Sequence, residues 1–111
     1  METPPKEQIL RDIDEAAERM GLEPEELVEM IDDVLDDALS KIPNLKAAAE
    51  AGDAQQTSAV AHDIKGSTIN YGIIAPSNVA KEIEIGKLDA VGQIPLLERL
   101  LLDIRAMNIS G

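Results

Sequence analysis

The chain has 111 residues, about the size of one small domain. Its 22 acidic side chains against 10 Lys and Arg give a net charge of −12, which disfavours nucleic acid as a partner, because phosphate backbones are bound by basic patches. Cys is absent and Tyr71 is the only aromatic residue, so disulfides, Cys-based zinc sites and base-stacking platforms are excluded. With 44% hydrophobic residues, the chain can nevertheless form a core.

Neither a secretory signal nor a membrane span is evident. The first residues lack the apolar segment of a signal peptide. The most apolar stretch, residues 94–104, is interrupted by Glu98 and Arg99 and is too short to cross a bilayer. We therefore expect a cytoplasmic protein without membrane contact, in which residues 1–111 form a single domain.

Two amphipathic segments open the chain. The first begins near Pro4 and Pro5, continues with apolar residues at spacings of three and four, and stops at Gly21. The second begins at Pro24, where acidic residues follow at the positive end of a helix, and extends to Gly52. Pro43 predicts a kink or an interruption of this helix, because proline lacks an N–H and clashes with the preceding turn.

Three more helices are expected. Asp53 is placed to cap a helix that runs to about Gly72, and a fourth helix begins near Pro76 and stops at Gly86. The last helix carries the leucines of residues 96–104, although Gly92 and Pro95 disturb its start. No alternating strand pattern is present. These elements predict an all-α fold, an antiparallel four-helix bundle over residues 24–108, with residues 1–22 as an N-terminal capping helix.

The only histidine, His62, lies on the third predicted helix. At about 100° per residue, one side of that helix is the core face, and His62 lies on the opposite, solvent side. The core face consists of Thr57, Val60, Ile64, Ser67 and Tyr71. The neighbours of His62 on the exposed face are Gln55, Ser58, Lys65, Gly66, Ile69 and Ile73.

Three of these neighbours distinguish His62 from an ordinary surface histidine. Gly66 costs a helix roughly 1 kcal/mol relative to Ala, but it leaves space for another backbone to approach the imidazole. Lys65 places a cation one turn away from the imidazole. Ile69 is an exposed apolar group of the kind that marks docking surfaces.

The segment Ala61-His62-Asp63-Ile64-Lys65-Gly66-Ser67-Thr68-Ile69-Asn70-Tyr71-Gly72 resembles the motif of histidine-containing phosphotransfer (HPt) domains, Ala-His-x-Leu-Lys-Gly-Ser-x-x-Asn-Leu-Gly. Ile64 and Tyr71 stand where the family usually has Leu. The resemblance extends over residues 24–108, through the long acidic helix with an internal Pro and the Ala-Gly-Asp turn at 51–53. Asp63 and Pro76 depart from the pattern.

The resemblance implies that His62 is the phosphoacceptor, that Lys65 stabilises the phosphoryl group and that Gly66 permits close approach of the partner. His62 would take the group from the aspartate of one receiver domain and pass it to another, the receivers belonging to response regulators and to a hybrid histidine kinase. Mg²⁺ is expected in the receiver, and no cofactor or metal in this chain, which we expect to be a monomer. The sequence has no ATP-binding motif, so the resemblance implies a phosphoryl carrier and not an enzyme. The expected partner-binding residues are Gln55, Ser58, Ala59, Ile69 and Ile73.

Two alternative hypotheses remain open. The chain is also similar to the N-terminal phosphotransfer domain of a chemotaxis-type histidine kinase, although the segment Lys6 to Met20 disfavours this. A helical adaptor that binds receivers without accepting phosphate is the other alternative, disfavoured by the combination of His62, Lys65 and Gly66. Lys81 on the fourth helix is either a cation that reaches toward His62 or a plain surface lysine. The acidic run at residues 32–37 indicates a solvated helix face more than a Ca²⁺ loop.

Overall fold

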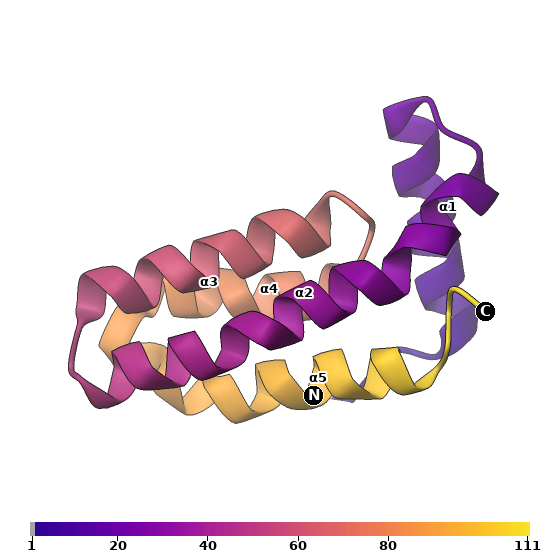
Figure 1. Cartoon of the computed structure of the whole chain (residues 1–111). Helices are drawn as coiled ribbons and strands as arrows, with labels where there is room; N and C mark the ends of the chain where they lie inside the picture. Colours follow the sequence, from indigo (N-terminus) through magenta and orange to yellow (C-terminus); the bar gives the residue numbers. More distant parts are fainter. Residues whose placement is uncertain (1) are drawn as a thin grey trace.

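The computed structural model describes residues 2–111, and within this range it contains five α-helices, one 3₁₀ helix and no strand. The predicted all-α class is confirmed. Helices α2 to α5 run alternately up and down beside one another, and α1 lies across one end of this bundle (Figure 1). The elements are α1 Lys6–Met20, α2 Pro24–Glu50, α3 Ala54–Ile69, α4 Ile74–Gly86, the 3₁₀ helix η1 Lys87–Gln93 and α5 Ile94–Ala106.

Local signals place most helix ends where the sequence predicts them. The side chain of Asp53 accepts a hydrogen bond from the backbone N–H of Gln56 at 2.9 Å, so it caps α3. Gly21 ends α1 in the left-handed region, with φ of 71°. Pro24 occupies the first turn of α2, where its missing N–H costs nothing. Helix α1 begins at Lys6, so the preceding prolines lie just outside its first turn.

The expected interruption at Pro43 is wrong, since α2 continues through this residue to Glu50. Pro43 is exposed, whereas Ile42 and Leu45 beside it are buried. Packing of the apolar face therefore keeps both halves of the helix in place, and the hydrogen bond lost at Pro43 lies on the solvent side. Pro95 likewise does not disturb the last helix, because it lies in the first turn of α5. Gly92 lies before α5, in the 3₁₀ helix η1.

Helix α3 ends at Ile69, about three residues before the predicted end at Gly72. The backbone N–H of Ile73 donates to the carbonyl of Thr68 at 3.0 Å, and Gly72 adopts a φ of +80°. This is the closure expected where a helix is terminated by a left-handed glycine. The chain therefore turns at residues 70–72, and the exposed face of α3 ends at Ile69.

One continuous apolar core runs through the bundle and includes α1. On α1, Ile9, Ile13, Ala16 and Ala17 are buried, so this amphipathic segment completes the core at one end. Gly72 lies directly against α1: a Cβ built on Gly72 would be 2.5 Å from the carbonyl oxygen of Asp12. The turn after α3 is thus held between the bundle and the capping helix.

Both ends of the chain are attached to the bundle. The hydroxyl of Thr3 donates to Asp103 on α5 at 2.6 Å. The hydroxyl of Ser110 donates to the carbonyl of Val28 at 2.7 Å and accepts from the backbone N–H of Asp32 at 2.9 Å. Val28 and Asp32 are four residues apart on α2. Ser110 therefore contacts a carbonyl and an N–H of the kind that bond to each other in an α-helix.

Replacing Gly72 by Ala tests the packing of α1 on this turn. We expect Gly72→Ala to lower the free energy of unfolding by about 2 kcal/mol or more, because the new methyl group meets the Asp12 backbone and the positive φ is strained. Gly92→Ala is the matched control, since a Cβ there meets nothing within 4 Å, and it should change stability by no more than about 0.5 kcal/mol. Denaturant unfolding measures the free energy of unfolding of both variants. Equal values for Gly72→Ala and Gly92→Ala would contradict the packing of α1 on the turn at Gly72.

Candidate functional site

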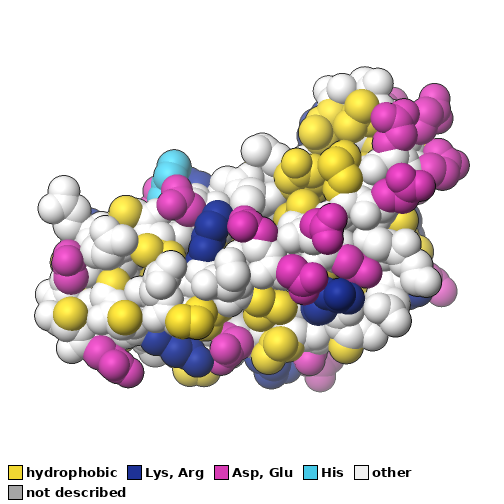
Figure 2. Space-filling view, in the orientation of Figure 1, with side chains coloured by type: hydrophobic (Ala, Val, Ile, Leu, Met, Phe, Trp, Pro, Cys, Tyr) yellow, Lys and Arg dark blue, Asp and Glu magenta, His cyan; other side chains and the backbone are white. Residues whose placement is uncertain are grey.

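His62 stands on the exposed side of α3, with its side chain 62% accessible (Figure 2). Helix α4 lies alongside, and two serines join the helices on either side of the imidazole. The hydroxyl of Ser58 on α3 donates to the carbonyl of Glu84 at 2.8 Å. The hydroxyl of Ser77 on α4 donates to the carbonyl of Lys65 at 3.3 Å. These short side chains allow the two helices to approach and fix their relative position around His62.

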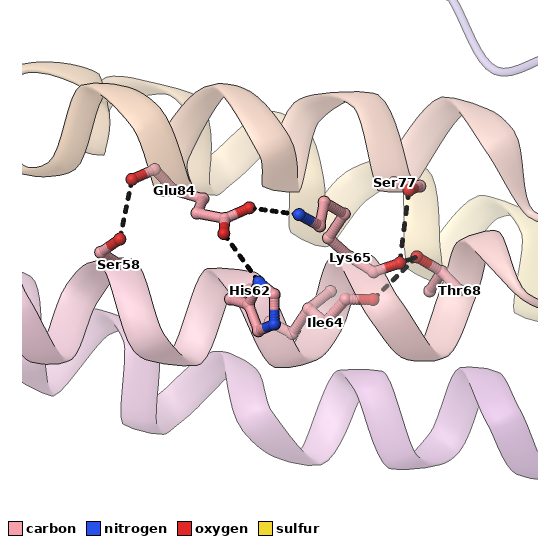
Figure 3. Close-up of polar contacts among 7 residues, drawn as sticks. All are labelled: Ser58, His62, Ile64, Lys65, Thr68, Ser77 and Glu84. Atoms are coloured by element: carbon pink, nitrogen blue, oxygen red, sulfur yellow. Dashed lines mark hydrogen bonds and ion pairs between the residues drawn. The ribbon is translucent and has the colours of Figure 1, made fainter.

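The carboxylate of Glu84 on α4 connects His62 and Lys65 of α3 (Figure 3). Its Oε2 lies 2.7 Å from Nδ1 of His62, and its Oε1 accepts a hydrogen bond from Nζ of Lys65 at 2.6 Å. The hydrogen bond from Lys65 lowers the pKa of Glu84 below its usual value, burial acts in the opposite direction, and the hydrogen bond with His62 lowers it further. Glu84 is therefore ionised near neutral pH.

This contact determines the tautomer of the imidazole. An ionised carboxylate only accepts hydrogen bonds, so the Nδ1 that faces Glu84 must carry the proton. In the neutral ring the lone pair is then on Nε2. Because the side chain is 62% accessible, a partner can reach the free nitrogen from solvent. One nitrogen of the imidazole is thus held by an acceptor, and the other points away from Glu84 (Figure 3).

Lys65 and Gly66 lie where the sequence places them, one turn after His62. Lys65 is half-buried and held by Glu84, so its charge lies beside the imidazole in a fixed position. A Cβ built on Gly66 would meet nothing within 4 Å, so the surface at this position is open. The three residues therefore form one accessible patch.

Three of the residues expected to bind a partner line a shallow depression at the imidazole. Gln55, Ser58 and Ala59 form its α3 side. Glu84 and Lys87 close it from the end of α4. The remaining lining residues are His62 and Asp63.

The two isoleucines expected to bind a partner, Ile69 and Ile73, differ in their exposure to solvent. Ile69 is 37% exposed and borders a second hollow with Met20 and Tyr71. Ile73 is buried, with 1% of its surface accessible, so its assignment as a partner-binding residue is wrong. Helical periodicity does not apply to Ile73, because α3 ends at Ile69 and the turn at Gly72 directs Ile73 into the core.

Glu84 is the residue that the sequence did not reveal. It is 22 positions after His62 in the chain, and only the packing of α4 on α3 brings them together. The one local signal is that Glu84 directly follows Ile83, a member of the inward stripe of α4, so its side chain lies at the edge of the helix interface. Lys81, the α4 residue for which the sequence suggests a contact with His62, is exposed, and its side chain makes no hydrogen bond or ion pair within residues 2–111.

The acidic run on α2 is paired with α5. Arg105 lies 2.8 Å from Asp36 and 3.4 Å from Asp32. Across the described chain, no three His, Asp or Glu side chains are arranged to hold a metal ion. No helix in residues 2–111 has both the length and the apolar composition that a bilayer crossing requires.

The charge of Glu84 predicts a pH dependence of stability. Because its folded-state pKa is lowered, its stabilising contribution is present above the ordinary value of 4.5 and is lost as the pH falls through the folded pKa. We expect Glu84→Gln to have a lower Tm than the wild type at pH 7, and the difference to shrink at about pH 3. The exposed Glu82→Gln serves as a control. A difference that is the same at both pH values would contradict the ionised bridge.

The comparisons with known proteins agree with this geometry. The family model described as the Hpt domain matches residues 29–108, more than two thirds of the 111-residue chain. Searches of curated proteins and of solved structures found no match. Domains of this family are phosphocarrier modules of phosphorelay signalling and interact with receiver domains. The chain, with its helical bundle and its exposed histidine, belongs to the Hpt domain family.

Proposed function

We propose that the protein accepts a phosphoryl group on Nε2 of His62 from the aspartate of one receiver domain and passes it to the aspartate of another. The observation that carries this proposal is the contact between Nδ1 of His62 and Glu84 at 2.7 Å. It leaves the accessible Nε2 as the unprotonated nitrogen. Membership of the Hpt domain family supports the same class of reaction.

The transfer requires little chemistry from this chain. The Nε2 lone pair forms the N–P bond while the bond between phosphorus and the aspartyl oxygen breaks, and its electron pair leaves with the carboxylate. The ring becomes positively charged, and the proton on Nδ1 stays in the hydrogen bond with Glu84, whose negative charge compensates it. Transfer to the second receiver reverses these steps. Positioning and charge neutralisation dominate such reactions.

The partners would be the receiver domains of response regulators and of a hybrid histidine kinase. Each receiver would bring the acidic pocket and the Mg²⁺, while this chain binds no cofactor and acts as a monomeric carrier. The contact face would follow α3 from Gln55 to Ile69, a distance of about 21 Å at 1.5 Å per residue. Gly66 lies on this face, in open space.

Incubation with a phosphorylated receiver tests the assignment of His62. The wild type should acquire an acid-labile phosphate, and His62→Gln should acquire none, because an amide nitrogen is not a nucleophile of this kind. His62 is exposed, so the variant should fold normally. Label retained by His62→Gln would refute the phosphoacceptor. Receiver binding by the wild type without any label would instead favour an adaptor.

Substitutions at Gly66 test the close approach of the partner. Gly66→Ala should stabilise the protein by up to about 1 kcal/mol, since Gly is the poorer helix former and a Cβ there is unobstructed. Gly66→Gln should also fold but slow transfer roughly 100-fold, because its side chain displaces the receiver from near-attack geometry. Thermal unfolding and transfer rate are measured on both variants. Transfer by Gly66→Gln at the wild-type rate would show that no partner backbone approaches here.

A further inference from the structure

The surroundings of His62 contain little free positive charge. A phosphoryl group on the ring adds roughly two negative charges near neutral pH. Lys65 is already bound to Glu84 at 2.6 Å, and Asp63 beside His62 is acidic. Lys65 therefore already compensates the charge of Glu84, so a second cation near the ring would stabilise the phosphoryl group further.

Lys87 is a second cation at the same depression. It follows the last residue of α4 and lines the hollow together with His62 and Glu84. It is exposed, and its side chain forms no hydrogen bond or ion pair in the part of the chain that the structure describes. A lysine carries its charge on a flexible stem of four carbons, so the ammonium group can follow a group that arrives at the ring.

The backbone of Lys87 is strained. Its φ of 51° and ψ of −125° lie in a region that residues with a Cβ rarely adopt. The adjacent Gly86 does not take this conformation, because its φ is −80° and its ψ is −18°. Gly86 is needed for packing instead: a Cβ there would lie 2.7 Å from the Cβ of Ala90.

Stability alone would favour glycine at position 87. The other non-glycine residue with positive φ in the described chain, Asn108 at 53°, is of a type that tolerates the left-handed region. Lys87 is not of such a type, and its strain is located at the depression that contains His62. Strained residues of this kind concentrate at functional sites.

We propose that Lys87 is a second phosphoryl-binding residue, whose ammonium group contacts the phosphoryl oxygens carried by Nε2 of His62. This inference rests on the proposed phosphotransfer function. The N–P bond forms and the aspartyl O–P bond breaks as described above, and Lys87 supplies only charge and hydrogen bonds. Lys65 stays on Glu84, and no proton leaves either lysine.

Three variants of the full chain test the charge of Lys87. Lys87→Gln should slow transfer from a phosphorylated receiver about tenfold or more, the usual consequence of losing one charge-assisted hydrogen bond. Lys87→Arg keeps the charge and should stay within about threefold of the wild type. Lys81→Gln is the matched control, since Lys81 is an exposed, unpaired lysine of α4 that does not line the depression. It should change the rate less than about twofold.

A fourth variant separates function from backbone strain. Lys87→Gly should raise Tm by about 3 °C or more, because glycine adopts the observed conformation freely, and it should slow transfer as much as Lys87→Gln does. A purely structural role would leave the rate unchanged on this substitution. An unchanged Tm would overturn the argument from strain.

The outcomes distinguish this inference from the function on which it rests. If the wild type is labelled on His62 and Lys87→Gln is labelled at the same rate, the role of Lys87 is overturned and the phosphoacceptor stands. Equal slowing by Lys87→Gln and Lys81→Gln would overturn it too, because net charge would then explain both. If no receiver labels the wild type, the proposed function fails and the inference fails with it.

Discussion

The carboxylate of Glu84 is the point at which α3 and α4 meet around the imidazole. It accepts hydrogen bonds from His62 and Lys65, and the carbonyl of the same residue accepts one from Ser58. One residue therefore fixes the ring orientation, the tautomer and the separation of the two helices. The bridge is strong enough to lower the pKa of Glu84 against the opposing effect of burial. Without it, His62 would be an exposed imidazole free to rotate and to exchange tautomers.

The bridge also determines how charge is distributed near the ring. The negative charge of Glu84 lies on the Nδ1 side of His62, where it stabilises a positive ring. The other ring nitrogen, Nε2, lies on the side away from this carboxylate (Figure 3). A single carboxylate thus orients the imidazole from one side and also holds Lys65.

Much of this molecule is predictable from apolar spacing and from a few capping residues. Asp53 caps α3 as expected, and the face that carries His62, Lys65 and Gly66 follows from helical geometry alone. The errors arise where tertiary packing overrides a local rule. Pro43 does not break α2, because its apolar neighbours are held by the core, and Ile73 is buried, because the helix ends before it.

Glu84 and Lys87 illustrate a different limit of prediction from the sequence. The contact of Glu84 with His62 depends on the packing of α4 against α3, and the positive φ of Lys87 depends on the turn after α4. Neither feature is encoded in periodicity. Periodic patterns report which face of a helix is buried, but not which residues of two helices are adjacent. A polar bridge between helices is therefore visible only once the register of the bundle is known.

The hydroxyl of Ser110 has a consequence for how the molecule opens. It donates to the carbonyl of Val28 and accepts from the backbone N–H of Asp32, so the first turns of α2 are joined to the last residues of the chain. In hydrogen-exchange experiments, the amide of Asp32 therefore reports whether the C-terminal residues are attached. Helix α1 also packs on α2, so segments near both ends of the chain contact the same helix.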